Sequence, residues 1–279
     1  MALVINTNLS ALNVMRNLDR NQDTIQVALQ RLSTGLRINS AKDDAAGLAI
    51  SERFMAQING LNQAARNASD AVSLAQTAEG ALDEIANNLQ RMRELAVQSA
   101  NATLSTSDRI SLNDEYNELA AEITRVSDAT SFNNVAILGT AVTLTFQVGP
   151  NPGSTNQIVL STVNVASASG VASLTAVSLG SATGSAALSA LTVVDTAIDT
   201  ISGIRADFGT IQNRFESVVR SVEYSSYSNS AALSRIRDAD FAAETANLVR
   251  GQIIEQAGIA ALVQANASPQ YVLSLLESS

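Results

Sequence analysis

Hydrophobic residues spaced three and four apart run through two long stretches of this chain, a pattern typical of helices that bury one continuous face. The first stretch begins near Met15 and reaches Leu36, and after Ser40 the spacing resumes and continues to about Ala100. At about 1.5 Å per residue, the second helix would be roughly 90 Å long. A helix of that length needs a partner along its apolar face.

Further helices are expected beyond this point. Ser and Thr residues interrupt the pattern between Thr103 and Ser107, and a shorter helix is predicted from about Asp108 to Ser127. The three-four spacing returns from Leu188 to Val222, and a final helical segment begins at Ile236. The simplest partners for the N-terminal helices are therefore the C-terminal ones.

The middle of the chain is marked by the absence of charge, since Ala129 to Val194 contains no Asp, Glu, Lys or Arg. Apolar and polar residues alternate in Ala141–Val148 and Gln157–Val163, which predicts a β-hairpin with its turn at Gly149–Gly153. A disordered low-complexity linker is the alternative interpretation.

Together these patterns predict a mainly α fold, a long antiparallel coiled-coil or helix-bundle rod with the N- and C-terminal helices paired. We expect terminal helices in residues 1–40 and 236–279, and a helical rod from residues 41–128 with 185–235. Residues 129–184 would form a small β and turn region at the outer end of the rod, with no large outer domain.

The outermost helices carry weaker apolar faces than the rod, and isolated helices of that kind are marginal in water. We expect these chain ends to fold when many copies bring their faces together, which predicts a self-assembling subunit. The residues predicted to form the self-assembly seams are Met15, Leu18, Ile25, Leu29, Leu32, Ala243, Ala246, Val249, Ile253, Ala257 and Ala260.

Composition excludes several classes of chemistry. The chain of 279 residues has no Cys, His or Trp, so disulfides and imidazole ligands are impossible. Its net charge is −9 and its arginines are scattered, which argues against nucleic acid as a partner. Met1 to Asn8 carries no cationic leader, and no apolar run has the length of a membrane span, so we expect neither a cleavable signal nor membrane insertion.

We expect no enzyme activity, cofactor or metal, because the remaining candidate groups form no catalytic constellation. Ser40 with Asp43 is predicted to cap the second helix. The negative charges of Asp43 and Asp44 would interact favourably with the helix dipole at that end. In the predicted helix from Asp108 to Ser127, acidic residues at four-residue spacing form an acidic edge, which consists of Asp114, Glu118 and Glu122. We expect this edge to face arginines of a neighbouring helix or subunit, and Arg125 is one candidate within the chain.

A second stripe lies beside the predicted buried face of the long helix and comprises Arg91, Leu95 and Gln98. An exposed leucine in such a stripe suggests a contact surface. An isolated surface leucine of no function is the alternative, because single exposed apolar residues are common.

Two long motifs at the chain ends identify a family. The N-terminal motif comprises residues 1–8, 29–48 and 89–101, and the C-terminal motif comprises residues 234–242 and 264–276. In both motifs the chain resembles bacterial flagellin.

This resemblance implies a subunit of the bacterial flagellar filament that serves swimming motility. Such a subunit is exported by the flagellar type III apparatus and polymerises outside the cell beneath a distal cap, with residues 1–40 and 236–279 forming the inner filament core. It also implies an export chaperone on the C-terminal segment, and hook-junction and cap proteins as partners.

The resemblance further implies that the monomer is a ligand of Toll-like receptor 5, through Gln90, Arg91, Leu95 and Glu115. One departure from the family pattern is Gly251, which stands where Ala is usual and should loosen its helix by up to about 1 kcal/mol.

Two alternatives remain open: a hook–filament junction or cap protein of the same export family, and a secreted coiled-coil adhesin or translocator. The motifs at both chain ends favour the filament subunit.

Overall fold

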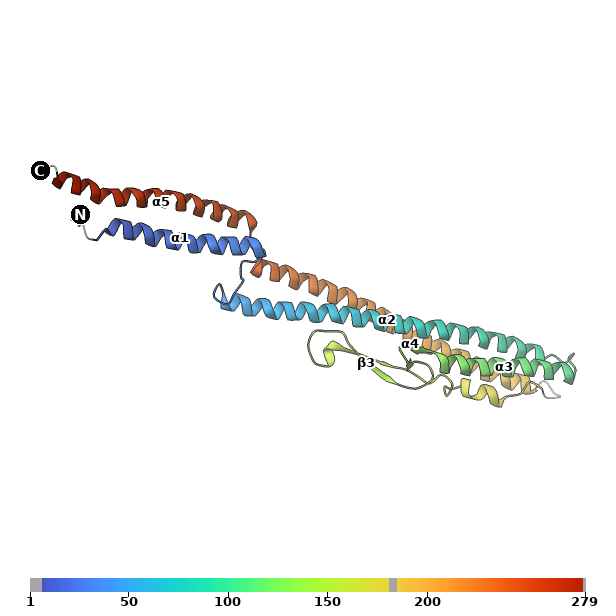
Figure 1. The fold of residues 1–279 in the computed structure, drawn as a ribbon. Helices are drawn as coiled ribbons and strands as arrows, with labels where there is room; N and C mark the ends of the chain where they lie inside the picture. The colour runs from blue at the N-terminus through green and yellow to red at the C-terminus, as the bar shows by residue number, and fades with distance from the viewer. Residues whose placement is uncertain (1–6, 181–184, 278–279) are drawn as a thin grey trace. The chain divides into compact units, whose positions relative to one another are not determined.

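A computed structural model describes residues 7–180 and 185–277, with the side chains of residues 268–277 outside the described part. It confirms the mainly α fold, in which the long helices are α1 (Leu9–Thr34), α2 (Ala45–Ser99), α3 (Thr106–Ala129), α4 (Ser185–Arg237) and α5 (Phe241–Glu277) (Figure 1). The motif residues 1–6 lie outside the described residues.

The predicted β-hairpin is confirmed. Strand β3 (Thr143–Gln147) pairs antiparallel with β4 (Gln157–Ser161), and the 3-10 turn η1 (Ser154–Asn156) precedes β4. The middle block also contains the short hairpin β1 (Ser131–Phe132) and β2 (Val135–Ala136), and a second 3-10 turn, η2 (Val171–Ala176). The sequence pattern did not predict β1 and β2, because two-residue strands are too short to show alternation.

The start of α2 differs from the expectation. Ser40 and Asp43 do contact each other, at 3.1 Å between Oγ and Oδ2, but they close a turn before the helix. The N-cap is Asp44, whose Oδ1 accepts a hydrogen bond from the Gly47 amide at 2.8 Å. Ser40 was therefore the wrong capping residue.

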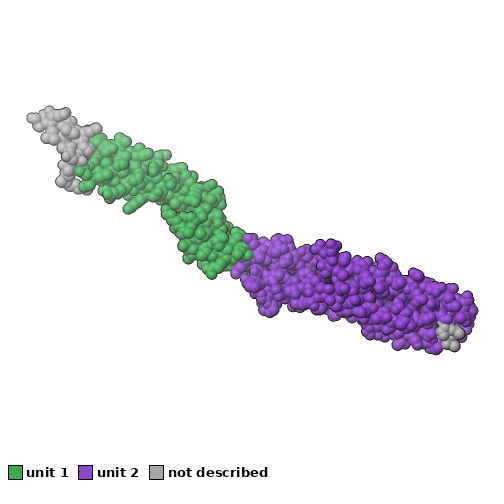
Figure 2. Space-filling model, turned by 60° about the horizontal axis from the view of Figure 1, so that its bottom comes forward, with its two compact units in different colours: residues 1–56, 228–279 green, residues 57–227 purple. Residues whose placement is uncertain are grey.

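The chain forms two compact units, coloured separately in Figure 2: unit 1 comprises residues 1–56 and 228–279, and unit 2 comprises residues 57–227. The predicted boundaries at residues 40 and 236 lie inside unit 1. Backbone hydrogen bonds explain the difference, since Arg37 donates to Arg237 at 2.6 Å and Ala239 donates to Gly35 at 2.9 Å. The segments that connect the helices are thus held together within unit 1.

Unit 2 buries one large apolar core between α2, α3, α4 and the middle block. Its fully buried side chains include the predicted α2 face Leu82, Ile85, Leu89 and Met92. Ile201 and Phe208 of α4 belong to the same cluster. Long helical faces were therefore predicted correctly here.

The β3–β4 hairpin does not cap the end of the helices, as the sequence suggested, but lies along their sides. Asn67 of α2 donates to the Gln147 carbonyl at 2.9 Å, and the rings of Phe146 and Phe215 meet edge to face with centroids 5.3 Å apart. Ile158 is buried against the same helices. The inward residues of a two-stranded hairpin need an apolar surface, and the helix sides provide it.

Within the described residues, α4 contains a window that is long and apolar enough to cross a membrane by composition, with mean hydropathy 1.3. The same helix supplies Ile201, Ile204 and Phe208 to the core of unit 2. In the structure 33% of that window is buried, and one such helix is weak evidence for a membrane span, because core helices can pass the same compositional test.

Candidate assembly surface on the terminal helices

Within unit 1, α1 and α5 run antiparallel and approach closely at two glycines. A Cβ atom placed on Gly251 would lie 2.7 Å from Ile25 Cγ1, and one on Gly258 would lie 2.6 Å from Leu18 Cδ2. A larger residue at either position would force the facing side chain to shift, so the two glycines let α1 and α5 lie this near without strain. Leu18 and Ile25, predicted as contacts between copies, therefore pack inside the chain.

Polar contacts also join the two helices. Asn8 Nδ2 donates to the Ala265 carbonyl at 2.8 Å, Asn21 Nδ2 donates to the Gly251 carbonyl at 2.7 Å, and Arg31 Nη1 donates to Glu244 Oε1 at 2.8 Å. Asn21 and Glu244 are buried, at 9% and 8% exposure. The sequence analysis missed both, because their positions show only once α1 and α5 are paired.

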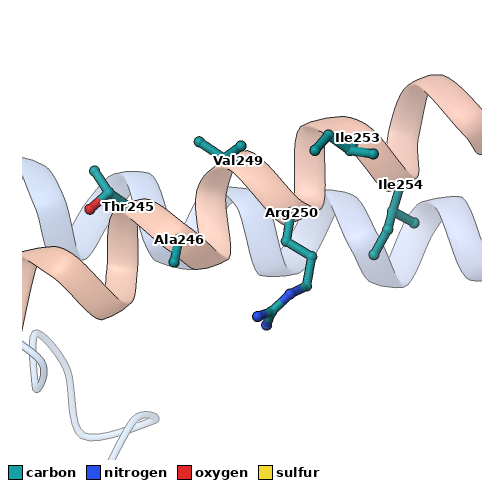
Figure 3. A pocket seen from close by; sticks show the side chains of 6 residues that line it. All are labelled: Thr245, Ala246, Val249, Arg250, Ile253 and Ile254. Atoms are coloured by element: carbon teal, nitrogen blue, oxygen red, sulfur yellow. The ribbon is translucent and has the colours of Figure 1, made fainter.

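The remaining faces of this helix pair expose large apolar side chains. On α1 these are Leu9, Leu12, Met15, Val27 and Leu29, and on α5 they are Phe241, Val249, Ile253, Ile254, Ile259 and Val263. Val249 and Ile253 are 52% and 60% exposed and project to the same side of α5 in Figure 3. They border a hollow of about 560 Å³ that Thr245, Ala246, Arg250 and Ile254 also line.

The predicted seam residues thus fall into two groups. Exposed ones are Met15, Leu29, Ala243, Ala246, Val249, Ile253, Ala257 and Ala260, whereas Leu18, Ile25 and Leu32 are half-buried. The prediction of one apolar seam on each terminal helix was therefore too narrow. Each helix carries one face toward its partner and at least one more toward the exterior.

Three of the four residues expected to contact the receptor are exposed: Gln90, Arg91 and Glu115. Arg91 forms ion pairs of 2.9 Å with Glu94 and with Glu115, and these hydrogen bonds raise the pKa of Arg91. The prediction of an exposed Leu95 is wrong, because that side chain is fully buried in the core of unit 2.

The acidic edge of α3 has one arginine partner as expected, since Arg125 contacts Glu122 at 2.6 Å. This exposed ion pair lowers the pKa of Glu122 through the Arg125 hydrogen bonds. Across the described ranges, Asp and Glu side chains nowhere gather in a group of three or more that could hold a metal ion.

Family comparison covers both ends of the chain. Residues 5–143 match the bacterial flagellin N-terminal helical region, and residues 191–276 match the bacterial flagellin C-terminal helical region. The matches include α1 and nearly all of α5.

Individual relatives extend this similarity over the whole chain. A flagellin of Halalkalibacterium halodurans is 46% identical over 275 residues, covering 98% of this chain and 100% of the relative. A flagellin of Xenorhabdus nematophila is 44% identical over 312 residues, covering 99% of this chain and 100% of the relative. A Vibrio parahaemolyticus structure assigned to a flagellar hook-associated protein is 13% identical with a TM-score of 0.58, covers 70% of this chain and 100% of its own, and shares the fold alone.

Proposed function

This chain belongs to the bacterial flagellin family and is a structural subunit of the extracellular flagellar filament, and we propose that its copies polymerise through the apolar faces that α1 and α5 leave uncovered. Filament formation by identical copies follows from the family. The proposal concerns which surfaces make the contacts.

The exposed apolar residues of α1 and α5 carry this proposal. Leu9, Val249, Ile253 and Val263 are each more than half exposed, on two helices that pack against each other. Burial of a large apolar side chain contributes about 1.5–3 kcal/mol. Several such residues covered by neighbouring copies would offset the entropy lost when a subunit joins the polymer.

Substitution at the α5 face tests the proposal. Purified chains carrying Val249→Ser with Ile253→Asn are added to sonicated filament fragments, and elongation is followed by electron microscopy. We expect elongation to be lost, because polar side chains cannot replace the apolar contact. Val159→Ser is the matched control, since Val159 is 50% exposed in unit 2, and it should elongate like the unmodified chain.

Equal elongation by the α5 variant and the unmodified chain would contradict the proposed surface. A coarser version of the test removes all residues after Arg235, which deletes α5. The truncated chain should not form tubes.

The same seeding experiment separates a filament subunit from a hook–filament junction protein. A filament subunit continues to add as long as monomer is present, whereas a junction protein adds only a short ring. The family match at both chain ends supports the filament subunit, and the hook-associated likeness, at 13% identity, does not bear on function.

The proposal extends to the route that brings the chain to the filament and to swimming motility. We place this chain among substrates of the flagellar type III apparatus, with an export chaperone on the C-terminal segment and with hook-junction and cap proteins as later partners. The exposed apolar face of α5 supports the proposed chaperone, because an uncovered face would allow copies to polymerise before export.

A chain lacking residues 236–279 should fail to co-purify with that chaperone and should not restore swimming to a flagellin-null strain.

The monomer is further proposed as a Toll-like receptor 5 ligand through the exposed side chains of Gln90, Arg91 and Glu115. The Arg91–Glu115 ion pair, which joins α2 to α3, supports this proposal because it holds two of these side chains next to each other. Leu95 supports that surface from within the core. Arg91→Ala should lower receptor activation by monomer in a reporter cell line, whereas Arg125→Ala, which breaks a different α3 ion pair, should not.

A further inference from the structure

The apolar contacts between α1 and α5 repeat at an interval of seven residues. Leu18 and Ile25 are seven residues apart on α1, and the glycines that receive them, Gly258 and Gly251, are seven apart on α5. A slide of α5 by seven residues would seat Ile25 on Gly258, or Leu18 on Gly251. The packing of Leu18 and Ile25 on the two glycines is therefore compatible with more than one register of α1 against α5.

The Asn21 hydrogen bond does not remove this ambiguity. Its acceptor is the Gly251 backbone carbonyl, and after a slide the Gly258 carbonyl would take the same place. The backbone bridge between Leu36 and Asp238 likewise uses groups that every residue carries.

One contact does depend on residue identity. Arg31 and Glu244 form an ion pair of 2.8 Å, and their side chains are only 28% and 11% exposed. The slide that seats Ile25 on Gly258 would bring Gly251 opposite Arg31, and the opposite slide would move the start of α5, at Phe241, past Arg31 and leave no α5 residue there. Either slide separates Arg31 from Glu244 and so breaks an ion pair whose two side chains are largely shielded from water, which is unfavourable.

We propose that the Arg31–Glu244 ion pair sets the register in which α1 pairs with α5. The role is that of a positioning pair: it decides which apolar residues of the two helices lie side by side on the outer faces. Buried polar residues fix register in the same way in coiled coils. This inference rests on the proposed function, because it concerns the surface through which copies polymerise.

Engineered disulfides can report the register, since the chain has no cysteine of its own. Leu18→Cys with Gly258→Cys reports the register of the structure. Ile25→Cys with Gly258→Cys reports the slid one, and it also carries Leu18→Ala because the cysteine at position 258 would otherwise meet Leu18 in the register of the structure. Each pair is introduced into the full-length chain, filaments are grown from seeds and oxidised mildly, and intrachain and interchain disulfides are separated on non-reducing gels.

With Arg31 and Glu244 intact, the native reporter should form intrachain disulfide at least about tenfold more than the slid reporter, as expected if a slide breaks an ion pair that is largely shielded from water. Glu244→Arg should bring the two yields close together or abolish assembly. The charge-swapped chain, Arg31→Glu with Glu244→Arg, should restore both assembly and the native preference. Glu255→Arg makes the same change in net charge elsewhere on α5 and should leave the preference unchanged.

The inference is overturned if Glu244→Arg filaments keep the native preference, or if the swap restores neither assembly nor register. Glu244→Gln, which keeps the shape but removes the charge, should give a preference between those of the intact and reversed chains. Failure of the proposed function would look different. Intact chains would then not elongate seeds at all, whatever their disulfide pattern.

Discussion

At the scale of single residues, helix propensity favours alanine at position 251, whereas packing against α1 favours the glycine that is present. Alanine is favoured over glycine in a helix by about 1 kcal/mol. However, the added Cβ would lie 2.7 Å from Ile25 Cγ1, an atom close to its own backbone. We therefore expect Gly251→Ala to lower the free energy of unfolding of the α1–α5 pair by roughly 1–3 kcal/mol, the usual cost of overpacking. Thermal melting of filaments followed by circular dichroism measures the effect.

Gly203 of α4 is the matched control, because a Cβ there would meet nothing within 4 Å. Gly203→Ala should stabilise the chain by about 0.5–1 kcal/mol. Stabilisation by both substitutions would show that Ile25 can move aside. Adding Ile25→Ala to Gly251→Ala should recover part of the loss if the close contact is its cause.

Tyr116 of α3 gives a second prediction at this scale. Its side chain is fully buried, and among the described residues its hydroxyl has no hydrogen-bond partner. Burial raises the pKa of Tyr116 to about 12, against about 10 in an unfolded chain. Between these values the unfolded chain has lost the proton that the folded chain keeps, so stability falls as pH rises from 10 to 12. Tyr116→Phe should make the free energy of unfolding less dependent on pH between 10 and 12, as measured by chemical denaturation. The same pH dependence in the variant would contradict the role given to the Tyr116 hydroxyl.

At the scale of elements, α3 begins with a reciprocal capping box. The Asp108 amide donates to Ser105 Oγ at 3.2 Å, and the Ser105 amide donates to Asp108 Oδ2 at 3.0 Å. Ser105→Ala should cost about 1 kcal/mol and should speed amide hydrogen exchange in the first turn of α3. Ser111→Ala, on the exposed side of the same helix, should not.

The Asp108 carboxylate adds a pH dependence to this cap. Hydrogen bonds from the Ser105 hydroxyl and amide lower the pKa of Asp108 below its ordinary value. Because the folded chain has the lower value, the stabilisation is present above the ordinary pKa and is lost as pH falls below it. Protection of the first-turn amides, measured as the exchange rate relative to the intrinsic rate at each pH, should fall on acidification, and Asp108→Asn should remove that dependence.

The elements themselves were largely predictable from the sequence, but their contacts were less so. The α2 face at Leu82, Leu89 and Met92 follows from three-four spacing, because residues at that spacing lie on one side of a helix. Leu95 lies just beside that face and was assigned to the exterior. It is buried because α2 packs against α3 as well as α4, so its apolar face is wider than one seam, and local spacing cannot tell how many helices will cover a face.

The hairpin shows the same limit. Alternation located β3 and β4 correctly, since it depends only on neighbouring residues. The contacts of Phe146 with Phe215 and of Gln147 with Asn67 join residues far apart in the sequence. No local pattern says whether a hairpin will extend a helix bundle or lie along it. Likewise, the buried Asn21 and Glu244 read as ordinary surface residues until α1 and α5 are paired.

At the scale of the whole molecule, charge is divided unevenly between the two units. Unit 1 has nine Lys and Arg against ten Asp and Glu, whereas unit 2 has eight against sixteen. The nearly neutral unit contains the proposed assembly faces, where identical surfaces must approach one another. Copies brought side by side in a polymer will repel mainly through unit 2.

This distribution predicts that filament growth depends on ionic strength through unit 2. The Debye length is about 8 Å at 0.15 M salt and about 30 Å at 0.01 M, so elongation from seeds should slow markedly at the lower concentration. Asp114→Asn with Glu118→Gln removes two exposed charges from α3 and should weaken that dependence. Asp19→Asn with Asp23→Asn makes the same charge change on α1 in unit 1 and should weaken it less. Elongation rates measured by light scattering at both salt concentrations decide the matter, and equal effects of the two variants would mean that repulsion arises from net charge rather than from unit 2.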